Sequence, residues 1–197
     1  MNTVMYLYES GGVGRYHTEP FPSQSVAHHT WGAMMLADQL FRPHLPREVS
    51  DELLRALLDH DTAERLTGDT PAPAKWLNPN LTEELNTAET EVFNQKQIPT
   101  FRTDDMFKAL MKAADYGEAL LYCASQLHAG NRYAERPFQR LRAVLRDVAC
   151  RLPDFAYEDE AEWRGALNGC ANAIRELVDE SMRLGYKPVN YSWEDEG

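Results

Sequence analysis

A short run of ionisable side chains, His60, Asp61 and Glu64, could do chemistry. If the run is helical, Glu64 lies one turn after the other two residues and shares their face. The run follows a mostly apolar segment at 53–58, so His60 and Asp61 should be half-buried and should need a partner. Imidazole and carboxylate together suit Mn²⁺, Fe²⁺, Co²⁺, Ni²⁺ or Zn²⁺. Taken alone, the run is more often a solvated helix end with an intrahelical His–Asp pair.

Two further residues could join such a site from neighbouring segments. His29 is expected on the apolar face of its helix, whereas His28 should point about 100° away from it. Asp115 lies in the middle of an expected helix, where aspartate is unfavourable, among methionine and alanine residues. A buried Asp115 needs an arginine, a hydroxyl or a metal as its partner. Individually, His29 is better explained as a core histidine and Asp115 as part of a structural salt bridge.

The elements that must position these residues are helices, because the dominant periodicity is helical. Ser25 is expected to cap a helix that carries His29 and ends before Pro43. The segment 67–73 should not be helix interior, since Pro71 and Pro73 each lack a backbone donor. We find no convincing alternating strand, and we therefore expect an all-α fold. Besides the helix after Ser25, helices are expected at about 50–64, 82–95, 103–130, 137–151 and 157–184.

Length and composition narrow the class of protein. The 197 residues are expected to form one domain over 1–197, with a core at about 15–185 and a tail at 186–197. A net charge of −11 disfavours a nucleic-acid polymer as partner, because phosphates are bound by clustered lysine and arginine. No apolar run approaches the roughly 18–20 residues of a membrane span, and no signal peptide is recognised. Three cysteines do not form a disulfide framework, so a cytoplasmic location is expected.

Taken together, these motifs resemble the HD-domain metal-dependent phosphohydrolases. His29, His60-Asp61 and Asp115 stand in that family's order and helical settings, and the likeness is closest to its bacterial 5′-deoxynucleotidase branch. The run 60–75 is similar to that branch almost residue for residue. The segment 25–30 looks like its Ser-Val-Ala/Ser-Glu-His-Ser segment, with His28 in place of the family's glutamate. The resemblance spans about residues 15–145 and implies an HD-type bundle of about six or more helices.

The resemblance also implies a metal and a reaction. It implies that one divalent ion, of Co, Mn, Zn, Fe, Ni or Mg, is held by four residues: His29, His60, Asp61 and Asp115. Glu64 is then the candidate base that orients or deprotonates the attacking water. Asp69 is the candidate that assists Glu64 or protonates the leaving 5′-oxygen.

Substrate contacts follow from the same resemblance. Arg15 and Lys75 are the cations expected to bind phosphate oxygens. Because the chain has a net charge of −11, an anionic substrate needs such local positive charges. Tyr16 and Pro73 are expected to contact the sugar or the base. Tyr16 stands where the family usually has tryptophan, which could change substrate preference.

The implied activity is hydrolysis of small-molecule deoxynucleotides, most closely the release of phosphate from deoxynucleoside monophosphates (dNMPs). One alternative is a triphosphohydrolase, because phage enzymes that cleave dATP to deoxynucleoside and triphosphate share the same motif set. A second is a non-catalytic nucleotide-binding HD module, against which the retained Glu64 and Asp69 argue. A third is a structural helical subunit, which would hold no stoichiometric metal. The resemblance further implies a homo-oligomer.

Overall fold

The computed structural model describes residues 3–15, 22–70, 72–99, 101–156 and 161–186. Within these ranges the predicted all-α class is confirmed. The expectation of no strand is corrected by an antiparallel pair, β1 (Gly14–Arg15) and β2 (Gln24–Ser25). Two-residue strands are too short to show an alternating pattern, so the sequence carries no signal for them.

Nine α-helices lie in the described part of the chain, and two short 3₁₀ segments flank α8. The helices are α1 (Thr3–Ser10), α2 (Val26–Leu40), α3 (Arg47–Asp59), α4 (Glu64–Thr67), α5 (Ala72–Leu77), α6 (Pro79–Lys96), α7 (Asp105–His128), α8 (Glu135–Arg151) and α9 (Ala161–Tyr186). The 3₁₀ segments are η1 (Arg132–Ala134) and η2 (Leu152–Phe155). No helix in the described ranges has both the length and the apolar character needed to cross a membrane.

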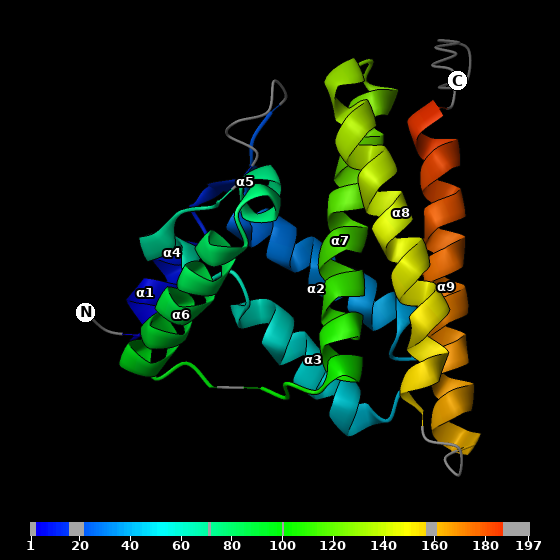
Figure 1. Ribbon diagram of the computed structural model, residues 1–197, viewed down its shortest axis with the longest axis horizontal. Helices are drawn as coiled ribbons and strands as arrows, with labels where there is room; N and C mark the ends of the chain where they lie inside the picture. Colours follow the sequence, from blue (N-terminus) through cyan, green and yellow to red (C-terminus); the bar gives the residue numbers. More distant parts are fainter. Residues whose placement is uncertain (1–2, 16–21, 71, 100, 157–160, 187–197) are drawn as a thin grey trace, which may run out of the picture.

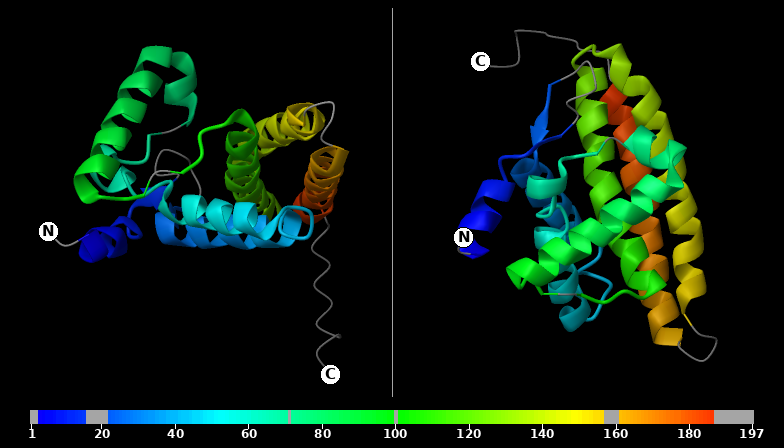
Figure 2. Two further views of the ribbon diagram at one scale, coloured as in Figure 1. Left: turned by 90° about the horizontal axis from the view of Figure 1, so that it is seen from below. Right: turned by 60° about the vertical axis from the view of Figure 1, so that its left-hand side comes forward.

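The long helix α7 is the centre of the fold (Figure 1). It packs against α2, α3, α8 and α9, and its buried face is rich in small residues that allow close approach. Figure 2 shows α7, α8 and α9 side by side, with α2 and α3 crossing them. α6 lies on the side of α7 that faces away from α8 and α9. One continuous cluster of buried apolar side chains joins α2, α3, α7, α8 and α9. This packing brings the face of α2 that carries His29 against α7.

The predicted helix from Ser25 is confirmed, because the Ser25 side chain accepts a hydrogen bond from the His28 amide at the start of α2. The predicted continuous helix at 50–64 is wrong at both ends. The first helix begins at Arg47 and ends at Asp59, and a turn at 60–63 separates it from α4. His60 and Asp61 therefore lie on a turn rather than on a helix.

The segment around the two prolines agrees with the prediction that Pro73 does not lie in a helix interior. α5 begins at Ala72, so Pro73 stands in the first helical turn, where a missing N–H costs no intrahelical hydrogen bond. Pro71 lies outside the described residues. Gly68, which ends α4, has a φ of 73°, a left-handed conformation that a glycine adopts without strain. This bend turns the chain between α4 and α5 and keeps Asp69 beside the end of α4.

Candidate metal centre and active site

Three predicted ligands from three separate segments meet at one place. His29 comes from α2, His60 from the turn after α3, and Asp115 from the middle of α7. One ligand atom from each lies within 4.8 Å of the other two. The Nε2 atom of His29 is 2.9 Å from Oδ1 of Asp115. These distances allow a single small cation to contact all three side chains.

Each of the two imidazole rings is held in place by a contact at its Nδ1 atom. Nδ1 of His60 lies 2.6 Å from the carbonyl oxygen of Leu57, and Nδ1 of His29 lies 2.5 Å from Oε2 of Glu118. A proton on each Nδ1 satisfies these acceptors and leaves the Nε2 lone pair free to bind a cation. Both Nε2 atoms are buried, and neither makes a well-directed hydrogen bond to a described residue. The donor set of imidazole nitrogen and carboxylate oxygen therefore fits a divalent metal ion.

Asp61 adjoins this trio and carries the second carboxylate. Its oxygens lie 3.3 Å from Nε2 of His60 and 3.7 Å from Nε2 of His29. Asp61 also forms an ion pair with Arg15 of β1, whose other terminal nitrogen is 3.9 Å from Asp115. The four predicted ligands are thus neighbours, and a guanidinium group stands against two of them.

The charges within the cluster shift two of its ionisation equilibria strongly. Burial lowers the pKa of His29, but contacts with Asp115 and Glu118 outweigh burial and raise it to about 9. Burial would raise the pKa of Asp115, but its contact with His29, together with nearby positive charges, holds it well below its usual range. The pocket therefore favours positive charge beside the Asp115 carboxylate. Without a metal this charge is a proton on His29, which a bound cation would displace from Nε2.

Glu64, the predicted base, lies at the start of α4 with 7% of its surface exposed. Its Oε2 atom is buried and has no hydrogen-bond partner among the described residues. Burial is the main cause that raises the pKa of Glu64 to about 8. The negative charges of Asp61 and Asp69 raise it further, while Arg15 and Lys75 oppose them. Asp69 and Lys75 are therefore close enough to Glu64 to act on its charge.

Two predicted substrate contacts cannot be located in the structure. Tyr16 lies outside the described residues. Pro73 is described only as part of the backbone of α5. His28, which stands in place of the family's glutamate, is exposed on α2, as its helical position predicts.

Glu118 and Gln24 contribute to the site but were not predicted from the sequence. Glu118 is 7% exposed on α7, about one turn after Asp115. Its second oxygen, Oε1, accepts a hydrogen bond of 2.6 Å from Nε2 of Gln24. A charged residue within the small and apolar run 117–121 is a signal that could have identified Glu118. Gln24 gives no such signal.

Glu89 on α6 is a further acid near the site that we did not predict. Burial raises its pKa, and the charges of Lys75, Asp61 and His60 also act on it. These interactions place the inner side of α6 near the cluster. Nothing in the amphipathic pattern of α6 distinguishes Glu89 from its other glutamates.

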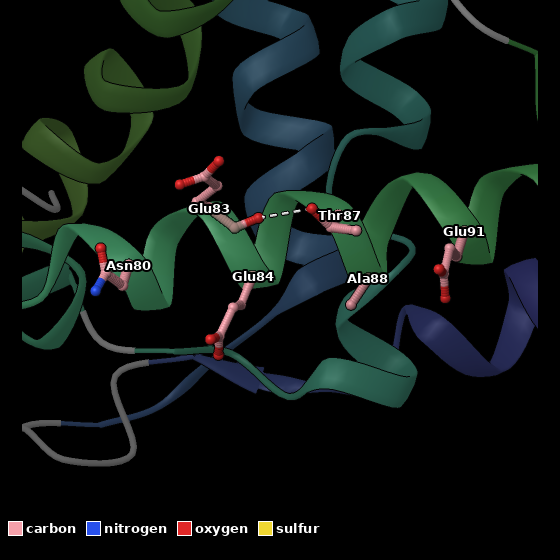
Figure 3. Close-up of a pocket in the computed structure, with 6 residues that line it drawn as sticks. All are labelled: Asn80, Glu83, Glu84, Thr87, Ala88 and Glu91. Carbon is pink, nitrogen blue, oxygen red and sulfur yellow. Dashed lines mark hydrogen bonds between the residues drawn. The ribbon is translucent and has the colours of Figure 1, made fainter.

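A shallow hollow lies along α6 and is distinct from the cluster (Figure 3). The hydroxyl of Thr87 in this hollow donates a 2.9 Å hydrogen bond to the carbonyl of Glu83. The lining shares no residue with the His–Asp cluster, and its carboxylates disfavour a phosphate group. The lining residues are Asn80, Glu83, Glu84, Thr87, Ala88 and Glu91.

Comparison with known proteins agrees with this architecture. Residues 15–157 match the model of the family described as 5′-deoxynucleotidase YfbR-like. A 5′-deoxynucleotidase from Vibrio atlanticus is 32% identical over 100 residues, which cover 44% of this chain and 52% of that protein. The 5′-deoxynucleotidase YfbR of Escherichia coli O1:K1 / APEC is 33% identical over 114 residues, 50% of this chain and 57% of that protein. The chain thus spans about half the length of the curated relatives it matches.

A solved structure with the same fold was also found. It is a cyanophage S-2L HD phosphohydrolase (DatZ) bound to dA and one catalytic Zn²⁺ ion. Its TM-score is 0.63 at 19% sequence identity, and the match covers 91% of this chain and 98% of that one. The likeness confirms the predicted HD-type helical fold.

Proposed function

The chain belongs to the YfbR-like 5′-deoxynucleotidase family, and from this premise we propose that it is a divalent-metal-dependent enzyme that releases phosphate from dNMPs. One observation carries the proposal. The buried Nε2 atoms of His29 and His60 meet the carboxylate of Asp115, and the buried Glu64 lies close enough to this group to be affected by the charge of Asp61. Buried ionisable groups with strongly shifted pKa values gather at catalytic sites. A non-catalytic nucleotide-binding module needs neither the glutamate nor its shifted pKa.

His29, His60, Asp61 and Asp115 would hold the ion. Two neutral imidazoles and two carboxylates balance the charge of a divalent cation, which suits the low exposure of this pocket. When bound, the ion would polarise the phosphoryl group and lower the pKa of a water molecule. The donor set admits several first-row metals, so the identity of the ion stays open among Co, Mn, Zn, Fe, Ni and Mg.

The remaining steps belong to the chain's own side chains. Glu64 accepts a proton from the attacking water, and its pKa of about 8 suits proton transfer near neutral pH. Asp69 follows α4 closely enough to influence Glu64. It either assists Glu64 or passes on to the leaving 5′-oxygen the proton that Glu64 takes from the water. Arg15 stands against Asp61 and Asp115, where a phosphate oxygen would arrive, and Lys75 approaches from α5.

A Lys75→Gln substitution tests the phosphate contact. We expect the KM for a dNMP to rise about tenfold while kcat changes little, because the contact is made equally in the ground and transition states. Steady-state kinetics of phosphate release measure both constants. Lys108→Gln, at an exposed position on α7, is the control and should leave KM unchanged. A fall in kcat at constant KM would instead give Lys75 a role in the chemical step.

Identifying the products decides whether the substrate carries one phosphate or three. The protein would be incubated with each dNMP and each dNTP in the presence of Co²⁺, Mn²⁺ or Zn²⁺, and the products separated by ion exchange. We expect inorganic phosphate from dNMPs, released about 10²–10⁴-fold more slowly when Glu64 is replaced by glutamine. Triphosphate and deoxynucleoside from a dNTP would contradict the monophosphate activity and establish the alternative. No turnover with any metal would leave the nucleotide-binding module.

We also propose one domain, in a homo-oligomer, in the cytoplasm. The larger buried cluster joins α2, α3, α7, α8 and α9, and a smaller one consists of Tyr6, Ala63, Val92 and Ile98. The ion pair of Arg15 with Asp61, which directly precedes this part of the chain, and the contacts of the His–Asp cluster connect the two parts and support a single domain. Trp31 is 63% exposed and Met35 44% exposed one turn apart on α2, which supports a subunit contact there. The cysteines Cys123, Cys150 and Cys170 are all free, which is compatible with a reducing compartment.

Sedimentation of the wild type and of Trp31→Lys tests the proposed homo-oligomer, which the substitution should weaken.

A further inference from the structure

A buried carboxylate to which the proposed reaction gives no step lies directly behind His29. Glu118 places Oε2 at 2.5 Å from His29 Nδ1, on the side of the ring opposite the candidate metal centre. Its other oxygen accepts from the Gln24 amide. Both oxygens of this nearly inaccessible side chain therefore have partners, and its orientation is fixed from two directions.

The backbone of α2 makes room for this carboxylate. A Cβ atom added at Gly32 would lie 2.6 Å from Cγ of Glu118, closer than real side chains approach one another. Gly32 stands three residues after His29 on the same helix, so the two residues share the face that meets α7. Glycine is unfavourable within a helix, so its presence here fits a need for space.

We infer that Glu118 is a positioning residue that holds His29 with a proton on Nδ1 and its Nε2 lone pair directed at the candidate metal centre. A carboxylate partner fixes the ring and makes the opposite nitrogen a stronger donor than a neutral carbonyl partner does. His60 has only the Leu57 carbonyl behind it, so His29 becomes the stronger of the two imidazole ligands. The inference rests on the proposed metal centre.

The same carboxylate also connects the metal centre to the strand pair. Gln24 is the register partner of Arg15 in the β1–β2 ladder. The hydrogen bond from Gln24 to Glu118 therefore braces the two-residue strand that presents Arg15 to Asp61. Glu118 thereby joins α7, α2 and β2 around one site.

The test is metal affinity, measured by competition between the protein and a chromophoric chelator for Zn²⁺ or Co²⁺. Glu118→Ala should bind about 10–100-fold more weakly than the wild type. Glu118→Gln should fall in between, because an amide oxygen can still accept the Nδ1 proton but carries no charge. Asp105→Asn, which removes one exposed charge from the same helix, is the matched control and should bind like the wild type. The Co²⁺ absorption spectrum should change with Glu118 and not with Asp105.

Gly32→Ala separates positioning from a general effect on folding. The added methyl group should displace Glu118 and weaken metal binding, although the substitution removes no polar group and favours the helix. In the Glu118→Ala background the methyl group has room, so Gly32→Ala should then leave affinity unchanged. If Glu118→Ala folds poorly, the metal affinity of Glu118→Gln still tests the inference, because this substitution keeps the shape of the side chain and removes only its charge.

Two results would overturn the inference: wild-type affinity in Glu118→Ala, or an equal effect of Gly32→Ala in both backgrounds. A wild-type chain that binds no metal would overturn it together with the metal centre. A wild-type chain that binds metal tightly but hydrolyses no deoxynucleotide would refute the proposed activity alone. The role of Glu118 is then still decided by affinity.

Discussion

Replacing Glu64 with glutamine should lower the rate of phosphate release about 10²–10⁴-fold, the usual contribution of a positioned general base. Glutamine has nearly the same shape but cannot accept the proton of the attacking water. Turnover of a dNMP at saturating metal measures the effect. Glu48→Gln, which changes an exposed acid on α3, is the control and should retain full activity. A Glu64→Gln variant within tenfold of the wild type would exclude Glu64 as the base.

The same substitution should stabilise the metal-free fold in a pH-dependent way. Folding raises the pKa of Glu64 from 4.5 to about 8, so the folded state disfavours the carboxylate. The resulting destabilisation is absent below about pH 4.5, grows as pH rises to about 8 and is then constant. Thermal unfolding in a chelator between pH 4 and 9 should show Glu64→Gln gaining stability over the wild type across that interval. A difference independent of pH would contradict the raised pKa of the buried Glu64 carboxylate.

The second large effect is expected from Asp115→Asn. Metal affinity should fall by more than about 100-fold, since even partners behind a ligand contribute 10–100-fold. The amide keeps the shape of the side chain but removes the negative charge that the surrounding groups stabilise. Metal content after dialysis and turnover with added metal should fall together. Asp105→Asn on the same helix provides the control.

Loss of turnover with unchanged metal content in Asp115→Asn would contradict the ligand assignment. Asp115 would then act on the substrate rather than on the ion. Retention of both properties would remove Asp115 from the site altogether.

Local sequence signals predicted the helices better than the turns that connect them. Ser25 was recognisable as a helix cap because capping depends on one side chain and one nearby amide. The break between α3 and α4 was not recognisable, because the apolar spacing continues across residues 60–63. The turn is what allows His60 and Asp61 to face the same cluster.

Long-range contacts explain what the sequence did not reveal. Glu118 meets His29 only because α2 and α7 cross at Gly32, and no spacing within either helix encodes that crossing. Gln24 is remote in sequence from Glu118, its hydrogen-bond partner. The resemblance of the motifs supplied Arg15, whose ion pair with Asp61 joins residues 46 positions apart. Composition and periodicity alone would have left Arg15 in a loop.

The central claim is that one divalent ion, held by the His–Asp cluster, is required for hydrolysis of a dNMP. The most direct measurement strips the protein with a chelator and titrates metal back while phosphate release is followed. The account predicts a negligible rate in the stripped protein and a rise that saturates at one ion per chain. Full activity without metal, or saturation only at two ions per chain, would contradict it.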